Sequence, residues 1–277
     1  MTPNNFAFIV GAQKSGTTSL ARALNDNPAI CLSHPKESDY FSGNYHKGED
    51  WYLSLFDASP SQIRLDASTS YAQRPLSKEA IDVCTNRVAF NGVPERIYQF
   101  CPTARIIYLV REPALRTYSH YWHNTKYGRE HRHFQQALEH DCFYTEVSQY
   151  YQQILPYYEL FSPEQILIVR FEDLICQQQE VIAQCERHLG VPAFDRQTLR
   201  NENKSFQYNR FGQMLISNPL TKNLDRLLPN QMTQGLKRWL KKTPPALPHQ
   251  ERLALNQRFA EDNSLFKQLT GTAYWQE

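Results

Sequence analysis

The residues best suited to chemistry lie within the first twenty positions, where segment 6–20 reads FAFIVGAQKSGTTSL. An apolar run ends at Gly11, a short polar loop follows, and helical character begins at Thr18. This strand–loop–helix order is typical of a phosphate cradle, in which loop N–H groups and a helix N-terminus face an anion. We therefore predict that the loop binds a phosphorylated ligand and that its lysine, Lys14, lies beside it.

The position of that lysine argues against the commonest kind of phosphate loop. In a nucleoside-triphosphate loop, the pattern Gly11-x4-Gly16 would be followed by a lysine that holds the β- and γ-phosphates. In this chain Thr17 occupies that position, and Lys14 sits inside the loop. The sequence thus predicts a single phosphate with a neighbouring group as the ligand, and not ATP.

A second group of polar residues follows the strongest apolar run of the chain, IIYLV at 106–110. Arg111 comes directly after this run, Pro113 suits the first turn of a helix, and Ser119 lies about two turns further on. A guanidinium and a hydroxyl placed in this way can hold a second phosphate. An alternative stays open, in which Arg111 pairs with a carboxylate such as Glu112 or Asp66.

The elements that must position these residues alternate along the chain, which predicts an α/β fold of P-loop type. We expect a mostly parallel sheet with helices on both faces and ligands at the carboxyl ends of the strands. We also expect a single domain over 1–277, with a core at about 5–192 and a helical C-terminal third at about 193–277. The expected strands are 6–10, 29–33, 63–68, 104–110 and 165–170. The expected helices are 18–24, 48–56, 77–90, 94–100, 113–126, 147–161, 177–189 and 248–269.

Composition limits the classes of protein to which this chain can belong. Thirty basic against 28 acidic residues give a formal charge of +2, which is too small for a general nucleic-acid binder. No apolar run reaches the length of a membrane span, and no leader pattern precedes the first strand. The six cysteines are scattered, which favours reduced thiols and a cytoplasmic protein. The histidine pairs 120/123 and 131/133 are in polar segments, and we predict no metal site.

Five segments, in order, resemble the sulfotransferases that use 3′-phosphoadenosine 5′-phosphosulfate (PAPS), the type that includes heparan-sulfate N- and O-sulfotransferases and their bacterial relatives. Any one of these segments is a weak signal, but their common order and spacing from residue 6 to about 190 make a strong one. The segments are QKSGTTSL at 13–20, HPKESDYF at 34–41, DASTSY at 66–71, VREPALRTYSHY at 110–121 and VRFEDL at 169–174.

The resemblance implies a donor site, residue by residue. Lys14 would contact the oxygen that bridges phosphorus and sulfur, where negative charge builds as the sulfuryl group leaves. Arg111 and Ser119 would bind the 3′-phosphate, with Lys204 as a further contact. The remaining loop residues would bind the 5′-phosphosulfate: Gln13, Ser15, Gly16, Thr17, Thr18 and Ser19.

The acceptor must lose a proton as it attacks, so a general base is expected within hydrogen-bond reach of it. The resemblance implies Glu37, and we expect Tyr40 and Phe41 to shield it from water. His34 and His123 are the reserve candidates, because an imidazole has a suitable pKa without tuning. The alternative is that Glu37 only pairs with Lys36.

The acceptor itself is left open as a hydroxyl or amine of a glycan, a lipid or polyketide alcohol, or a phenol. Several glycan-acting relatives have a lysine where this chain has Ala67, which weakens any transfer of glycan specificity. Two other classes also remain at this point. One is a small-molecule kinase with a P-loop, which would need ATP and Mg²⁺. The other is a nucleotide-binding module without catalysis.

Overall fold

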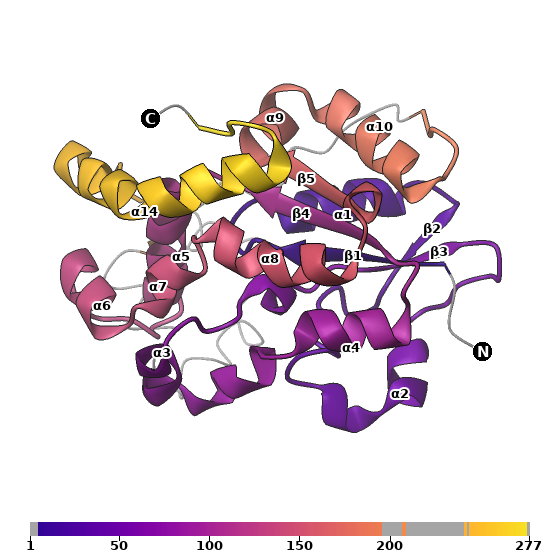
Figure 1. Ribbon diagram of the computed structural model, residues 1–277, viewed down its shortest axis with the longest axis horizontal. Helices are drawn as coiled ribbons and strands as arrows, with labels where there is room; N and C mark the ends of the chain where they lie inside the picture. The colour runs from indigo at the N-terminus through magenta and orange to yellow at the C-terminus, as the bar shows by residue number, and fades with distance from the viewer. Residues whose placement is uncertain (1–4, 196–206, 209–240, 243, 276–277) are drawn as a thin grey trace, which may run out of the picture.

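A five-stranded, fully parallel sheet forms the centre of the protein (Figure 1). The computed structural model describes residues 5–195, 207–208, 241–242 and 244–275. Along the sheet the strand order is β2-β3-β1-β4-β5. The strands are β1 (Phe6–Gly11), β2 (Ile30–Leu32), β3 (Ile63–Asp66), β4 (Arg105–Val110) and β5 (Ile166–Arg170). The predicted α/β class with a parallel sheet is confirmed.

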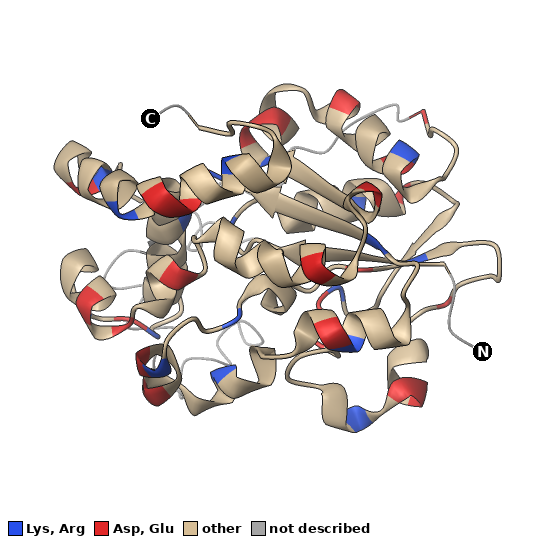
Figure 2. Ribbon diagram, in the orientation of Figure 1, with Lys and Arg blue, Asp and Glu red and all other residues tan. Residues whose placement is uncertain are grey.

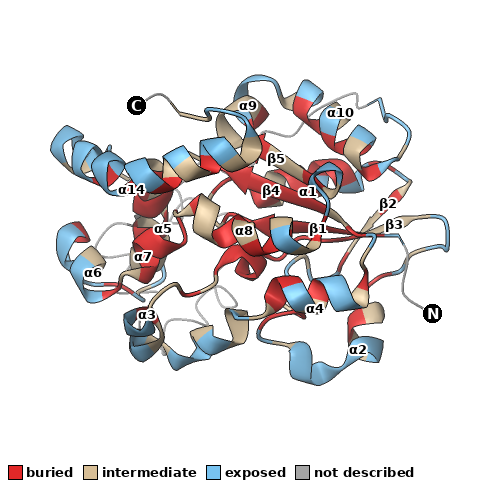
Figure 3. Cartoon of the chain, in the orientation of Figure 1, coloured by how far each residue is buried: buried red, intermediate tan, exposed pale blue. Residues whose placement is uncertain are grey.

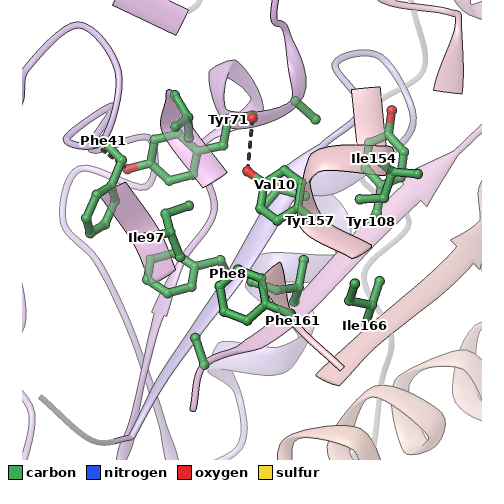
Figure 4. Packing of buried hydrophobic residues seen from close by; sticks show 14 of the residues in the cluster. Phe8, Val10, Phe41, Tyr71, Ile97, Tyr108, Ile154, Tyr157, Phe161 and Ile166 are labelled. Carbon is green, nitrogen blue, oxygen red and sulfur yellow. Dashed lines mark hydrogen bonds between the residues drawn. The ribbon is translucent and has the colours of Figure 1, made fainter. Parts of the chain in front are cut away.

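Alternating residues of β1 and β4 are buried on opposite faces of the sheet, as the period of a strand requires. Phe8 and Tyr108 face a core that contains the rings drawn in Figure 4, whereas Ile9 and Leu109 face a separate core. Helices α1 (Thr17–Asn25) and α10 (Gln178–Leu189) cover the second of these cores. The first is covered by α2 (Glu49–Leu53), α4 (Val93–Phe100), α8 (Tyr150–Leu160) and α14 (His249–Thr270).

Both faces of the sheet are therefore shielded, and Figure 3 shows the strands mostly buried beneath helices whose outer sides are exposed. Charged residues lie mainly on the helices and loops around the sheet (Figure 2). This distribution is the physical basis of the layered fold, because buried parallel strands are apolar on both faces.

A third cluster of buried side chains lies where α5 (Pro113–Lys126) meets α14. Helices α6 (Phe134–His140) and α7 (Phe143–Glu146) contribute to the same cluster. The other short elements are α3 (Lys78–Val83), α9 (Phe171–Cys176), and the 3₁₀ helices η1 (Tyr45–Lys47), η2 (Thr69–Ala72), η3 (Thr85–Phe90) and η4 (Pro163–Gln165).

The predicted elements differ from the structure in a few places. The single helix expected over 77–90 is broken at Cys84, whose extended backbone separates α3 from η3. Helices α6, α7 and α9 were not expected from the sequence. Strand β5 is at the edge of the sheet, so Leu167 and Ile168 are only partly buried, not buried on both faces as their apolar run suggests.

The C-terminal third is not purely helical. Strands β6 (Gln207–Tyr208) and β7 (Lys241–Lys242) pair antiparallel in it, whereas the final predicted helix is confirmed as α14. None of the helices in the described part of the chain has the length and apolarity that a membrane crossing needs.

Candidate active site

The loop between β1 and α1 is built on two close approaches of the backbone to other side chains. A Cβ at Gly11 would lie 3.0 Å from the Tyr108 ring, and one at Gly16 would lie 3.0 Å from the Phe171 ring. Gly16 also has a φ of +89°, a backbone conformation that residues other than glycine rarely adopt. The first N–H groups of α1 have no carbonyl acceptor inside their own helix. These features are the ones that the predicted anion cradle requires, and Gly16 provides no side chain to cap the helix.

Lys14 lies in this loop, and its Nζ atom is 3.5 Å from Nδ1 of His123 on α5. The pKa of Lys14 is lowered to about 8, first by burial and then by the positive charges of Lys126, Arg111 and Arg116. Glu37 is the carboxylate that opposes this lowering. In the described part of the chain no ion pair joins Lys14 to a carboxylate. The ammonium charge is therefore available to a bound anion.

Arg111 lies beside the same loop, where Phe171 contacts its guanidinium and Tyr150 contacts its backbone. Its Nη1 atom donates to the carbonyl of Lys14 at 3.4 Å, and its Cζ atom is 4.7 Å from the centre of the Phe171 ring. The hydroxyl of Tyr150 donates to the Arg111 carbonyl at 2.7 Å and accepts from its N–H at 3.3 Å. The Nε atom of Arg111 is buried and has no hydrogen-bond partner among the described residues.

The alternative pairings of Arg111 with Glu112 or Asp66 are not formed. Glu112 instead accepts two hydrogen bonds of 2.6 Å from Arg252. Asp66 accepts hydroxyl hydrogen bonds from Ser38 at 2.6 Å, and from Ser68 and Tyr71 at 2.7 Å each. Both carboxylates thus have other partners, and the guanidinium of Arg111 remains able to bind an anion.

The Asp66 network also fixes the loop that carries Glu37. Ser38 is the residue after Glu37, and its hydroxyl is tied to the buried carboxylate at the end of β3. Burial raises the pKa of Asp66, and the hydroxyl donors oppose that rise. On the other side of Glu37, the Ser33 hydroxyl donates to the Lys36 carbonyl at 3.0 Å. The backbone around Glu37 is therefore held at both ends.

Glu37 itself is exposed, with 46% of its side chain accessible, and it forms a 2.8 Å ion pair with Lys36. The expected shielding by Tyr40 and Phe41 is wrong, because both rings lie in the core on the α4 and α8 face. Of the reserve candidates, His34 is exposed, whereas His123 is half-buried next to Lys14.

His123 lies one turn beyond Ser119 on α5, and Ser119 is partly exposed. Burial lowers the pKa of His123 to about 4, and the charges of Lys14, Arg129 and Lys126 contribute. Its imidazole is therefore neutral at pH 7 and can accept a hydrogen bond from Lys14.

The predicted donor residues of the loop lie together around the start of α1. Ser15 and Thr17 are buried, and the others are partly exposed: Gln13, Gly16, Thr18 and Ser19. Lys204, predicted as a further contact, lies outside the described residues. Two positioning residues were missed. Phe171 lies in the segment VRFEDL at 169–174, but the sequence does not indicate its contact with Arg111. Tyr150 is predicted only as an aromatic residue of a helix.

The histidine pairs do not gather further ligands. His120 is buried in α5, where its Nδ1 atom is 3.4 Å from Nη1 of Arg116, and His131 and His133 are exposed. Within the described residues, no group of three or more His, Cys, Asp or Glu side chains is arranged to hold a metal ion.

The parallel sheet with its loop between β1 and α1 is the fold of a known class of transferase. The chain belongs to the sulfotransferase family, since the family model for the sulfotransferase domain matches residues 5–238. Over 127 residues it is 37% identical to the bifunctional heparan sulfate N-deacetylase/N-sulfotransferase 2 of Bos taurus, covering 44% of this chain and 13% of that protein. Over 118 residues it is 33% identical to the heparan sulfate glucosamine 3-O-sulfotransferase 5 of Homo sapiens, covering 42% and 29%.

The chain thus matches only a minor part of each of these relatives. Two solved structures are similar over most of their length. A sulfotransferase from Alicyclobacillus acidocaldarius has a TM-score of 0.68 at 23% identity, with 98% of this chain and 97% of that chain covered. Mouse sulfotransferase SULT7A1, solved in complex with PAP, has a TM-score of 0.56 at 15% identity, with 98% and 90% covered. These likenesses confirm the fold predicted from the sequence.

The cradle gives a prediction about Gly16. The change Gly16→Ala should lower the free energy of unfolding by about 1–3 kcal/mol. Alanine is strained at the positive φ of this position, and its Cβ would displace the Phe171 ring. Urea denaturation measures the loss. Gly43→Ala is the control, since a Cβ there meets nothing within 4 Å. Equal stability of the two variants would contradict this account of the loop.

Proposed function

We propose that this protein transfers the sulfuryl group of PAPS to a hydroxyl or amine of an acceptor. The observation that carries the proposal is the proximity of two cationic residues, Lys14 and Arg111. The Nη1 atom of Arg111 donates to the backbone carbonyl of Lys14 at 3.4 Å. A donor that carries a 5′-phosphosulfate and a 3′-phosphate offers each of these cations an anionic partner. Membership in the sulfotransferase family supports the same donor.

In the proposed reaction, the acceptor atom forms a bond to sulfur as the bond from sulfur to the bridging oxygen breaks. The electron pair stays on that oxygen, and adenosine 3′,5′-bisphosphate leaves. Lys14 would stabilise the developing charge by its ammonium group, which is already partly removed from water. The cradle residues would hold the 5′-phosphosulfate: Gln13, Ser15, Gly16, Thr17, Thr18 and Ser19. No step requires a metal ion in this scheme.

Arg111 and Ser119 would bind the 3′-phosphate, with Lys204 as a further predicted contact. The buried, unpartnered Nε atom of Arg111 supports this role among the described residues. An anion there would be bound in the donor and in the product alike.

Glu37 is the proposed general base, with His34 and His123 in reserve. Its loop is fixed on both sides by the hydroxyl contacts of Ser33 and Ser38. The negative charge of Glu37 is also the one that raises the pKa of Lys14. The lowered pKa of about 4 makes His123 a weak base and favours a role as the acceptor of a hydrogen bond from Lys14. In the resting structure Glu37 is paired with Lys36, and the acceptor would have to compete with that exposed ion pair.

The acceptor class stays open among a glycan, a lipid or polyketide alcohol, and a phenol. We propose a cytoplasmic location, because all six cysteines are free. The kinase alternative is less favoured, because the family match and the position of Thr17 both argue against an ATP-dependent enzyme. The non-catalytic alternative is less favoured because the candidate catalytic and donor-binding residues are all present: Lys14, Glu37, Arg111 and Ser119.

The direct test of this proposal uses PAPS labelled at sulfur and a panel of sugar, alcohol, amine and phenol acceptors. We expect label on one acceptor class, with release of adenosine 3′,5′-bisphosphate. If the protein neither binds nor consumes PAPS with any acceptor of the panel, the proposal is wrong.

The first mutational prediction separates the two cations. Lys14→Ala should reduce kcat by orders of magnitude and weaken the binding of adenosine 3′,5′-bisphosphate far less, since that product lacks the sulfuryl group. Arg111→Ala should mainly weaken the binding of donor and product, because its contact exists in the ground and transition states alike. Steady-state kinetics and calorimetry measure the two effects. Equal losses of product affinity would mean that these roles are misassigned.

The second mutational prediction concerns the base. Glu37→Gln keeps the shape of the side chain and removes its basicity, so kcat should fall by about two to four powers of ten. PAPS affinity should hardly change, and the acidic limb of the pH–rate profile should disappear. Near-normal turnover of Glu37→Gln, together with loss of activity in a His34 or His123 variant, would assign the base to an imidazole instead.

A further inference from the structure

The C-terminal helix α14 contacts the segment that carries Arg111 from outside the family-matched part of the chain. Figure 1 shows α14 lying across α5 and beside α8, and its residues contact both helices. The family match ends at residue 238, whereas α14 begins at His249. The contacts of α14 with the site therefore lie outside the part of the chain that the family model matches.

The first contact of α14 is a two-point ion pair next to Arg111. The Nε and Nη2 atoms of Arg252 donate to the two carboxylate oxygens of Glu112, each at 2.6 Å. Glu112 is the residue between Arg111 and the first residue of α5, and 14% of its side chain is accessible. Its backbone N–H donates to Glu172 at 3.2 Å. A paired guanidinium and carboxylate fix orientation as well as distance, so this contact sets the path of the chain beside Arg111.

The second contact of α14 is with the N-terminal end of α8, the helix whose Tyr150 hydroxyl contacts the Arg111 backbone. Tyr150 is the first residue of α8, and the preceding N-cap residue, Gln149, provides no side-chain cap. The buried carboxylate of Asp262 accepts instead from the N–H groups of Tyr151 at 3.1 Å and Gln152 at 3.3 Å. The carboxylate therefore caps α8 from another helix.

Apolar contacts with the core also hold α14 in place. Phe266 is buried in the core cluster, and its ring centre is 6.0 Å from that of Tyr150. Arg252 and Asp262 are ten residues apart, or about 15 Å along the helix. One helix thus contacts both the residue after Arg111 and the helix end that holds the Arg111 backbone.

We propose that Arg252 is a positioning residue for donor binding, which acts through Glu112 to hold Arg111 where it can bind the 3′-phosphate. The inference rests on the proposed function, because it takes Arg111 as a donor contact. Arg252 touches neither donor nor acceptor in this scheme. Its removal should therefore weaken the binding of donor and product and leave the chemical step nearly unchanged.

The test compares the affinity for adenosine 3′,5′-bisphosphate, measured by calorimetry, with the KM for PAPS and with kcat. Arg252→Gln should weaken the bisphosphate and raise the KM by about three- to tenfold, the range of a charge-assisted pair at a partly exposed site. Arg252→Glu places like charges together and should cost more. The reversed pair, Glu112→Arg with Arg252→Glu, should recover most of that loss. Arg258→Gln, an exposed change on the same helix, should leave the affinity unchanged.

Three results would overturn the inference. In the first, all Arg252 variants bind the bisphosphate as the wild type does, whether or not they melt at a lower temperature. In the second, the reversed pair binds no better than Arg252→Glu alone. In the third, Arg252→Gln lowers kcat as strongly as it raises the KM. Failure of the proposed function is distinguishable from all three, because the wild-type protein would then not bind the bisphosphate at all.

Discussion

An ammonium group held partly out of water at the end of a buried strand is the constraint on which the rest of the site depends. Burial and three neighbouring cations lower the pKa of Lys14 to about 8, so the charged form is costly in the resting protein. A bound anion removes that cost, because it restores a favourable partner to the charge. The burial that makes this charge costly therefore favours binding of an anion, and in the proposed reaction the charge stabilises the leaving oxygen.

The architecture serves this constraint through the carboxyl ends of its parallel strands. Strand β1 leads into the loop of Lys14, β4 leads into Arg111, and the Asp66 network at the end of β3 fixes the loop of Glu37. Aromatic residues from elsewhere complete the arrangement. Phe171 supports the Arg111 guanidinium and limits residue 16 to glycine, whereas Tyr150 binds the Arg111 backbone from α8. Functional groups at this edge are thus held by contacts between segments that are distant in the sequence.

The sequence predicted the features that depend on local pattern. The apolar runs predicted the five strands, the glycine spacing predicted the loop between β1 and α1, and Pro113 predicted the start of α5. Patterns of this kind say little about tertiary contacts. Helices α6, α7 and α9 are too short for helical periodicity to be visible in the sequence, and the break at Cys84 involves a single residue. Tyr40 and Phe41 seemed suited to cover Glu37 because they are close in sequence, yet the chain turns both rings into the core. The contacts of Tyr150 and Arg252 with the Arg111 segment join residues 39 and 140 positions apart, and no local signal marks them.

The most direct test of the central claim, that this edge of the sheet binds a bisphosphorylated adenosine ligand and not a nucleoside triphosphate, is ligand-dependent thermal stability. Binding to the native state raises its stability by RT ln(1 + [L]/Kd), or about 2.7 kcal/mol at a ligand concentration of one hundred times Kd. Adenosine 3′,5′-bisphosphate should therefore raise the melting temperature by several degrees, and ATP with Mg²⁺ should raise it much less. A larger shift with ATP and Mg²⁺ than with the bisphosphate would contradict the account.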